Sequence, residues 1–262
     1  MDAQSASNPV SLRSALAKLY PDPEKLDAAL RELLMASPVA AEERAVGEVD
    51  LDLARATRCG FPEVVFGEGK SAETIIQILR QQQLAGQDSL VTRVSSEHTE
   101  VILREFPGAL PNPVARTIRM RQSGSCKMRG GPVFVVTAGT SDRPVAEEAI
   151  ETLRWMKVES ELIIDVGVAG PHRLQKHIPR LQSAAVIVCV AGMEAALPSV
   201  LGGYVPCPVI GVPTSVGYGA SLQGITAMLS MLTCCASNVA CVNIDAGFKG
   251  GYLAGLIASR MS

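Results

Sequence analysis

The chain has 262 residues, of which 47% are hydrophobic and 19% are charged. This composition excludes an intrinsically disordered protein. Its 24 Lys and Arg residues nearly balance its 26 Asp and Glu residues, so no general positive field is present to hold nucleic acid. We therefore expect a globular protein that acts on a small molecule.

The first residues carry neither a basic nor an apolar stretch, which predicts a cytoplasmic protein without a secretory signal. The seven cysteines form no CxxC pair, which argues against a disulfide framework or structural zinc. No charged residue or histidine occurs between Glu194 and Asp245. Prolines and glycines interrupt this segment, so we expect a buried core and no membrane span.

The first half predicts a small α/β domain. Prolines and glycines between residues 107 and 125 predict a boundary, which divides the chain into domains 1–125 and 126–262. Residues 1–130 contain 33 charged residues and residues 131–262 only 17, so the second half must bury more surface, in a core or against further copies. The expected elements of the first half are helices at residues 23–36, 71–83 and 96–106 and strands at residues 62–66 and 90–94.

The second half alternates short β-branched runs with helical segments. Such continuous apolar runs are typical of a parallel sheet that is covered by helices on both faces, so we expect a doubly wound α/β fold. Ligands bind beyond the carboxyl ends of the strands in such sheets. The expected strands lie at residues 133–136, 162–166, 185–190, 209–212 and 240–244.

The first two strand ends carry small, hydroxyl and basic residues. Gly139, Ser141 and Asp142 precede a predicted helix, where they either cap that helix or hold a phosphate. His172 and Arg173 follow the second strand. They are either a solvated basic pair or part of an anion site.

The third strand leads to Glu194, a carboxylate in a long apolar neighbourhood. Its pKa is expected to be raised by desolvation, unless it merely complements a helix dipole. Cys234 and Cys235 follow a predicted helix at residues 221–232, and from the residues alone each is best interpreted as a structural thiol. The fourth strand leads to candidate phosphate-binding residues, namely Thr214, Ser215, Gly217 and Gly219.

These loops resemble the carboxylase and mutase family that acts on aminoimidazole ribonucleotide in purine synthesis. The matching segments are AGTSD at residues 138–142, PHR at residues 171–173 and AGMEAALP at residues 191–198. The purine enzymes carry a histidine at the position of Ala196, and this chain has Glu194 two residues earlier.

Those departures resemble a sister family, the pyridinium-3,5-biscarboxylic acid mononucleotide synthases of nickel-pincer nucleotide biosynthesis, which supplies the lactate racemase cofactor. The resemblance implies a flavodoxin-like sheet with a smaller N-terminal α/β domain. The family's reactive cysteine lies ten residues before the Asp of VNIDAGF, which selects Cys235, and its glutamate falls on Glu194. Further matching segments are DLARATRCGFPEV at residues 52–64, VPTSVGYG at residues 212–219 and VNIDAGF at residues 242–248.

The resemblance implies carboxylation of nicotinic acid adenine dinucleotide at ring carbon C5 with CO2 or bicarbonate, and hydrolysis of its phosphoanhydride to release AMP. Cys235 would add to the pyridinium ring as a nucleophile, and Glu194 would act as a base. The residues at the other strand ends would bind ribose and phosphate. The resemblance implies no tightly bound cofactor and leaves a requirement for Mg²⁺ open.

The resembled families form octamers, which implies a homo-octamer here. Three other functions stay open from the sequence: an aminoimidazole ribonucleotide carboxylase or mutase, a non-catalytic nucleotide-binding module, and a subunit that only assembles a complex. The alanine at position 196 argues against the first, and Glu194 together with Cys235 argues against the other two.

Overall fold

The computed structural model describes residues 44–46, 49–122 and 128–261, together with three isolated positions nearer the N-terminus. The expected turn at residues 123–125 and almost all of the expected helix at residues 23–36 lie outside the described residues. The chain divides into two compact units, Met1–Gly60 and Phe61–Ser262. Within the described residues, no helix is long and apolar enough to cross a membrane.

The first unit contains a short hairpin and one helix. Strand β1 (Arg44–Val46) pairs antiparallel with β2 (Val49–Leu51), and helix α3 (Arg55–Cys59) follows. The guanidinium of Arg58 donates a 3.0 Å hydrogen bond to the Asp52 carboxylate. This bond joins the first residue of the segment at residues 52–64, which carries the family resemblance, to helix α3.

The second unit begins with a small mixed sheet. Strands β3 and β4 are parallel, β4 pairs antiparallel with β6, and β6 pairs antiparallel with β5. Ser71 and Ser95 cap the two helices that pack on this sheet, because each hydroxyl accepts a backbone N–H of the first turn. The elements are β3 (Val65–Phe66), α4 (Ala72–Leu84), β4 (Ser89–Thr92), α5 (Ser96–Glu105), β5 (Leu110–Asn112) and β6 (Thr117–Met120).

The strands β5 and β6 correct one expectation. The prolines and glycines after residue 106 suggested the start of a domain boundary, but this segment returns to the small sheet as two strands. Pro111 is tolerated because β5 is an edge strand, where a missing backbone N–H breaks no ladder. The proposed division at residues 125 and 126 stays a prediction.

The large sheet has five parallel strands in the order β11-β10-β9-β7-β8. Numbered along the chain, this order is 2-1-3-4-5, which is the flavodoxin-like arrangement. The predicted fold class is therefore confirmed. The strands are β7 (Val133–Thr137), β8 (Ser160–Ile163), β9 (Val186–Ala191), β10 (Val209–Pro213) and β11 (Val239–Cys241).

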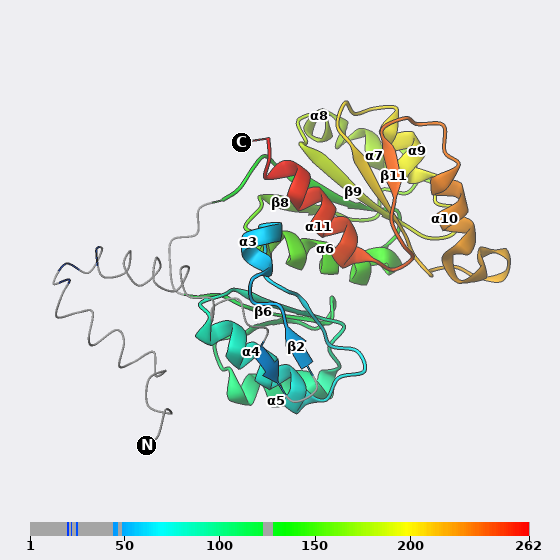
Figure 1. Ribbon diagram of the computed structural model, residues 1–262. Coiled ribbons are helices and arrows are strands. Elements are labelled where there is room, and N and C mark those ends of the chain that lie inside the picture. The colour runs from blue at the N-terminus through cyan, green and yellow to red at the C-terminus, as the bar shows by residue number, and fades with distance from the viewer. Residues whose placement is uncertain are drawn as a thin grey trace, which may run out of the picture. The chain divides into compact units, whose positions relative to one another are not determined.

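Helices cover both faces of this sheet (Figure 1). Val133 and Val135 of β7 pack into one apolar cluster, while Phe134 and Val136 pack into another on the opposite face. This alternation follows from the two-residue period of a strand. One face is covered by α6 (Arg143–Trp155) and α11 (Gly247–Ala258), and the other by α7 (Pro171–Gln175), α8 (Ile178–Leu181), α9 (Leu197–Gly202) and α10 (Ile225–Leu232).

Helix α6 is buried between the two sheets of the second unit. On one side Gly251 of α11 approaches it so closely that an added Cβ would lie 2.6 Å from the Ala149 carbonyl oxygen. On the other side the Arg119 guanidinium of β6 donates a 2.9 Å hydrogen bond to the Glu151 carboxylate. Loops from the small sheet are thereby held beside the start of α6.

The expected helix at residues 221–232 is shorter in the structure. Leu222 and Gln223 have φ values of 46° and 53°, which breaks the helix, and α10 begins at Ile225. A 3-10 segment, Gly219–Gly224, precedes it. No spacing of apolar residues signals a left-handed break of this kind.

Candidate active site

The loops that follow the first three strands of the large sheet enclose a cavity of about 350 Å³, which we call the main cavity. This volume is within the range of small-molecule sites, about 300–1,000 Å³. Gly139, Ser141, Arg173 and Glu194 line it, as the sequence predicted for a site at the strand ends. Asp165, in the loop that follows β8, also lines it, and the sequence did not indicate it as a site residue.

The carboxylate of Asp142 joins three of the loops. It accepts hydrogen bonds from the Gly139 backbone N–H at 2.8 Å and from the Thr214 hydroxyl at 2.7 Å, and the Gly192 backbone also bonds to it. Burial raises the pKa of Asp142, and these hydrogen bonds counteract the rise by favouring the ionised form. The Thr214 hydroxyl is thus used by the Asp142 carboxylate, and Thr214 is fully buried.

Glu194 lies in a tight turn after β9. The residues on either side, Met193 and Ala195, have φ values of 52° and 50°, and the Met193 N–H donates a 2.9 Å hydrogen bond to the Val216 carbonyl. Gly192 is required here because an added Cβ would lie 2.3 Å from that same carbonyl oxygen. The Glu194 side chain is exposed, so the desolvation predicted from its apolar neighbourhood in the sequence is not present in the described chain.

Arg173 supplies a positive charge to the wall of the main cavity. Its guanidinium forms an ion pair with the Asp165 carboxylate. Asp165 itself has φ of 63°, and its backbone N–H donates to the Thr137 hydroxyl at 3.1 Å. His172 is exposed and does not line the main cavity.

The loop after β10 forms a separate hollow of about 410 Å³. Ser215, Gly217 and Gly219 line it with Tyr218, whose side chain is 81% exposed. Gly217 and Gly219 have φ values of 152° and 55°, which glycine adopts without the strain of a side chain. Three of the four predicted residues of this loop therefore face solvent, and Thr214 faces the core.

Cys235 lies at the end of the strands opposite to the main cavity. It is exposed in the loop that joins α10 to the amino end of β11, whereas Glu194 follows the carboxyl end of β9. Because the strands are parallel, Cys235 and Glu194 lie at opposite ends of the strands. One copy of the chain does not bring Cys235 and Glu194 together.

Left-handed backbone at residues other than glycine is concentrated around these hollows. Such conformations cost about 1–3 kcal/mol each and often mark functional sites. Of the described residues in this conformation, all except Lys157 line the main cavity, the hollow after β10 or a third hollow between α6 and the small sheet. They are Arg93, Arg116, Asp165, Met193, Ala195, Leu222, Gln223 and Asp245.

The described side chains offer no group of three or more His, Cys, Asp or Glu residues that could hold a metal ion.

The structure defines a flavodoxin-like α/β protein with a cavity beyond the strand ends, where sheets of this kind bind their ligands. Two family models match the chain: a LarB/PurE-like N-terminal domain over residues 43–122 and AIR carboxylase over residues 132–262. The chain belongs to the AIR carboxylase family of carboxylases and mutases and carries the LarB/PurE-like domain in front. The resemblance found in the sequence is confirmed at this level.

An uncharacterised protein of Methanocaldococcus jannaschii is 42% identical to this chain, over 80% of this chain and 84% of that protein. An N5-carboxyaminoimidazole ribonucleotide mutase of the same organism is 34% identical, over 47% of this chain and 75% of that protein. The crystal structure of Treponema denticola PurE covers 50% of this chain and 78% of its own, with 20% identity and a TM-score of 0.39.

Proposed function

We propose that the protein carboxylates the pyridinium ring of nicotinic acid adenine dinucleotide at carbon C5 and hydrolyses the phosphoanhydride, giving pyridinium-3,5-biscarboxylic acid mononucleotide and AMP. The observation that carries this proposal is Glu194, which lines the main cavity on a strained turn. The turn precedes Ala196, where the resembled purine enzymes carry their histidine. The family supports a carboxylation or carboxyl transfer at this site.

The electron-poor pyridinium ring needs an electron pair before it can attack CO2. In our proposal the Cys235 thiolate forms a C–S bond at the ring carbon next to C5, and the ring becomes a neutral dienamine. Carbon C5 then forms a C–C bond with CO2. Glu194 takes the proton from C5, the C–H electron pair restores the ring, and the C–S bond breaks to release the thiolate.

This mechanism needs Cys235 from a neighbouring copy, since one chain separates it from Glu194. The helix that leads to Cys235 exposes Ile225, Leu229 and Leu232 along one stripe, while Ala227 and Met231 are buried on the other side. A helix that is apolar all round is typical of a buried position. The α10 surface therefore supports contact with a second copy that would carry Cys235 towards a main cavity.

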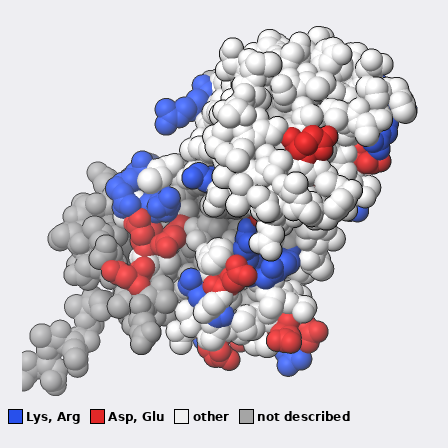
Figure 2. All heavy atoms as spheres, turned by 90° about the vertical axis from the view of Figure 1, so that its right-hand side faces the viewer, with Lys and Arg blue, Asp and Glu red and all other residues white. Residues whose placement is uncertain are grey.

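The surface around the large sheet supports an assembly of more than two copies. Figure 2 shows the side on which α10 lies in Figure 1, and the part formed by the large sheet and its helices carries few charged side chains. Further exposed apolar residues lie in α9, in the loops on either side of it and in the loop after β10, and their spread supports more than one contact between copies. We propose a homo-octamer. These further exposed residues are Met193, Val200, Tyr204 and Tyr218.

The main cavity supports binding of the mononucleotide half of the substrate. Ser141 lies before the thirteen-residue helix α6, whose positive end favours an anion. Arg173 is half-buried and suits a carboxylate or phosphate. The exposed hydroxyl of Ser215 and the Gly217 backbone suit the sugar or a second phosphate, with Asp142 positioning the loops.

In the hydrolysis a water oxygen forms a bond to the phosphorus of the mononucleotide half. The bond from this phosphorus to the bridging oxygen breaks, and that oxygen leaves with AMP and the electron pair. The proton of the water passes to solvent. Water supplies all the atoms that this step adds.

A second candidate function is carboxylation or carboxyl transfer on an aminoimidazole ribonucleotide. The 34% identity to an N5-carboxyaminoimidazole ribonucleotide mutase, over 47% of this chain, favours it. The imidazole is already an enamine and needs no thiol, so the two reactions differ in their need for Cys235.

The two functions are separated by giving the purified protein each substrate with bicarbonate. We expect the dinucleotide to be consumed with formation of AMP, and the carboxylated imidazole nucleotide to remain unchanged. Interconversion of the imidazole nucleotides without consumption of the dinucleotide would replace our proposal with the second candidate.

A further inference from the structure

A third hollow, of about 260 Å³, lies between the start of α6 and two loops of the small sheet. We call it the arginine cavity. It adjoins the main cavity, because Ser141 and Val216 line both. Its remaining lining residues are Arg93, Val114, Ala115, Arg116, Pro144, Val145, Glu148, Ser215 and Asp245.

Two arginines of the small sheet reach this cavity from strained positions. Arg93 follows β4 with φ of 53°, and Arg116 precedes β6 with φ of 54°. The two loops hold each other, because the Val94 N–H donates to the Arg116 carbonyl at 2.9 Å and the Arg116 guanidinium donates to the Arg93 carbonyl at 3.4 Å. Strained residues of this kind cluster at active sites and ligand-binding positions.

The two guanidinium groups differ in how closely the cavity wall holds them. Arg93 donates to the Asp245 carbonyl at 2.6 Å and lies 3.9 Å from the Glu148 carboxylate. In the described part of the chain Arg116 has no carboxylate within ion-pair distance, its side chain is exposed, and its hydrogen bond to the Arg93 carbonyl is a long one of 3.4 Å. The Arg116 guanidinium therefore has donors left for an anion that enters the cavity.

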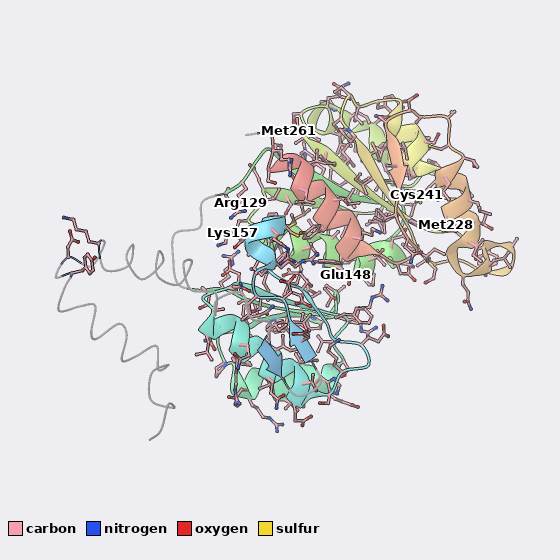
Figure 3. The ribbon with its side chains drawn as sticks, viewed as in Figure 1. Arg129, Glu148, Lys157, Met228, Cys241 and Met261 are labelled. Carbon is pink, nitrogen blue, oxygen red and sulfur yellow. The ribbon has the colours of Figure 1, made fainter. Side chains whose placement is uncertain are left out.

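The carboxylates of the wall are occupied by backbone donors. Glu148 accepts a 3.0 Å hydrogen bond from the Phe248 N–H at the start of α11, and Asp245 accepts a 2.9 Å hydrogen bond from the Ser215 N–H. Burial raises the pKa of Glu148, while the Phe248 N–H and the charges of Arg93 and Arg116 favour its ionised form. Figure 3 shows Glu148 on α6, facing the small sheet.

The third anion-binding feature of this cavity is the positive end of α6. Ser141, just before α6, and Pro144 and Val145 of its first turn line the cavity. A helix N-terminus combined with guanidinium groups is a phosphate site by the ordinary chemistry of both.

We propose that the arginine cavity binds the nucleoside 5′-monophosphate half of a dinucleotide, with Arg116 and Arg93 holding its phosphate. This inference rests on the proposed function, and it gives that function a second compartment. The phosphoanhydride would lie over Ser141, between the two cavities. When its bridging oxygen leaves with the electron pair, Arg116 neutralises the new charge on the departing monophosphate.

The test measures AMP binding by titration calorimetry to the full-length wild type, to Arg116→Gln and to Arg104→Gln. Arg104 is an exposed arginine on α5, outside the three hollows, and serves as the matched control. We expect AMP to bind the wild type and the control equally and Arg116→Gln about tenfold more weakly, as for a lost charge-assisted hydrogen bond. Binding of nicotinic acid mononucleotide should be the same in all three.

Equal AMP affinity in Arg116→Gln and wild type would overturn the inference, and so would an absence of AMP binding to the wild type. Competition of AMP with nicotinic acid mononucleotide for one site would also overturn it. If AMP binds in an Arg116-dependent manner but neither nicotinic acid mononucleotide nor nicotinic acid adenine dinucleotide binds, the AMP site is supported and the proposed substrate is rejected.

Discussion

The hydroxyl of Thr214 donates a 2.7 Å hydrogen bond to the carboxylate of Asp142, and both side chains are buried. Thr214→Val removes this donor and leaves the carboxylate with only backbone partners. We expect a loss of about 1–3 kcal/mol in the free energy of unfolding, measured with denaturant. Thr233→Val is the control, because its exposed hydroxyl donates within its own helix turn, and we expect a change within about 0.5 kcal/mol.

The cost of Thr214→Val should depend on pH. Burial raises the folded-state pKa of Asp142 above its unfolded value, so its contribution to stability falls as the pH rises through that raised pKa. The Thr214 hydroxyl lowers this pKa by favouring the ionised form. We therefore expect a larger destabilisation near pH 8 than near pH 4. An equal cost at both values would mean that the bond is not to an ionised Asp142.

The sequence predicts the parallel sheet and several residues of the main cavity, but not how the loops contact one another. Continuous β-branched runs predicted the parallel sheet, and the rule that ligands bind beyond strand ends led to Ser141, Arg173 and Glu194. That rule could not show that Thr214 turns inward to Asp142, since this depends on the register of separate loops. Arg93 and Arg116 were missed because left-handed arginines have no pattern in the sequence.

Gly192 tests the shape of the Glu194 turn. An added Cβ would lie 2.3 Å from the Val216 carbonyl oxygen and 2.6 Å from the Thr214 hydroxyl oxygen. Gly192→Ala should therefore destabilise the protein by about 1–3 kcal/mol and displace Glu194, so that activity falls. Gly108→Ala, where an added Cβ meets no atom within 4 Å, should retain stability and activity. Equal behaviour of the two variants would contradict a rigid turn.

The two adjacent cysteines give a sharp comparison. Cys235 is exposed, whereas Cys234 is half-buried. Cys235→Ser should abolish carboxylation at unchanged thermal stability, and Cys234→Ser should keep most of the activity. If Cys235 acts in a neighbouring copy, co-assembly of Cys235→Ser with Glu194→Gln should restore part of the activity. Full activity of Cys235→Ser alone would remove the thiol from the mechanism.

The apolar stripe on α10 predicts the assembly. Light scattering at micromolar concentration should give a mass several times the 27.6 kDa of one chain, and Leu229→Glu should lower it because a charge would be buried at the contact. Leu84→Glu is the control, since that leucine is 76% exposed on α4 of the small sheet. A wild-type monomer would contradict the proposed sharing of Cys235.

The most direct test of the central claim is the fate of labelled carbon. The wild type is incubated with nicotinic acid adenine dinucleotide and carbon-13 bicarbonate, and the products are analysed by mass spectrometry and carbon-13 NMR. We predict AMP without label and a pyridinium mononucleotide with one labelled carboxylate on ring carbon C5, and no labelled product from Cys235→Ser. An unlabelled nicotinic acid mononucleotide as the sole pyridinium product would show hydrolysis without carboxylation and would contradict the proposed function.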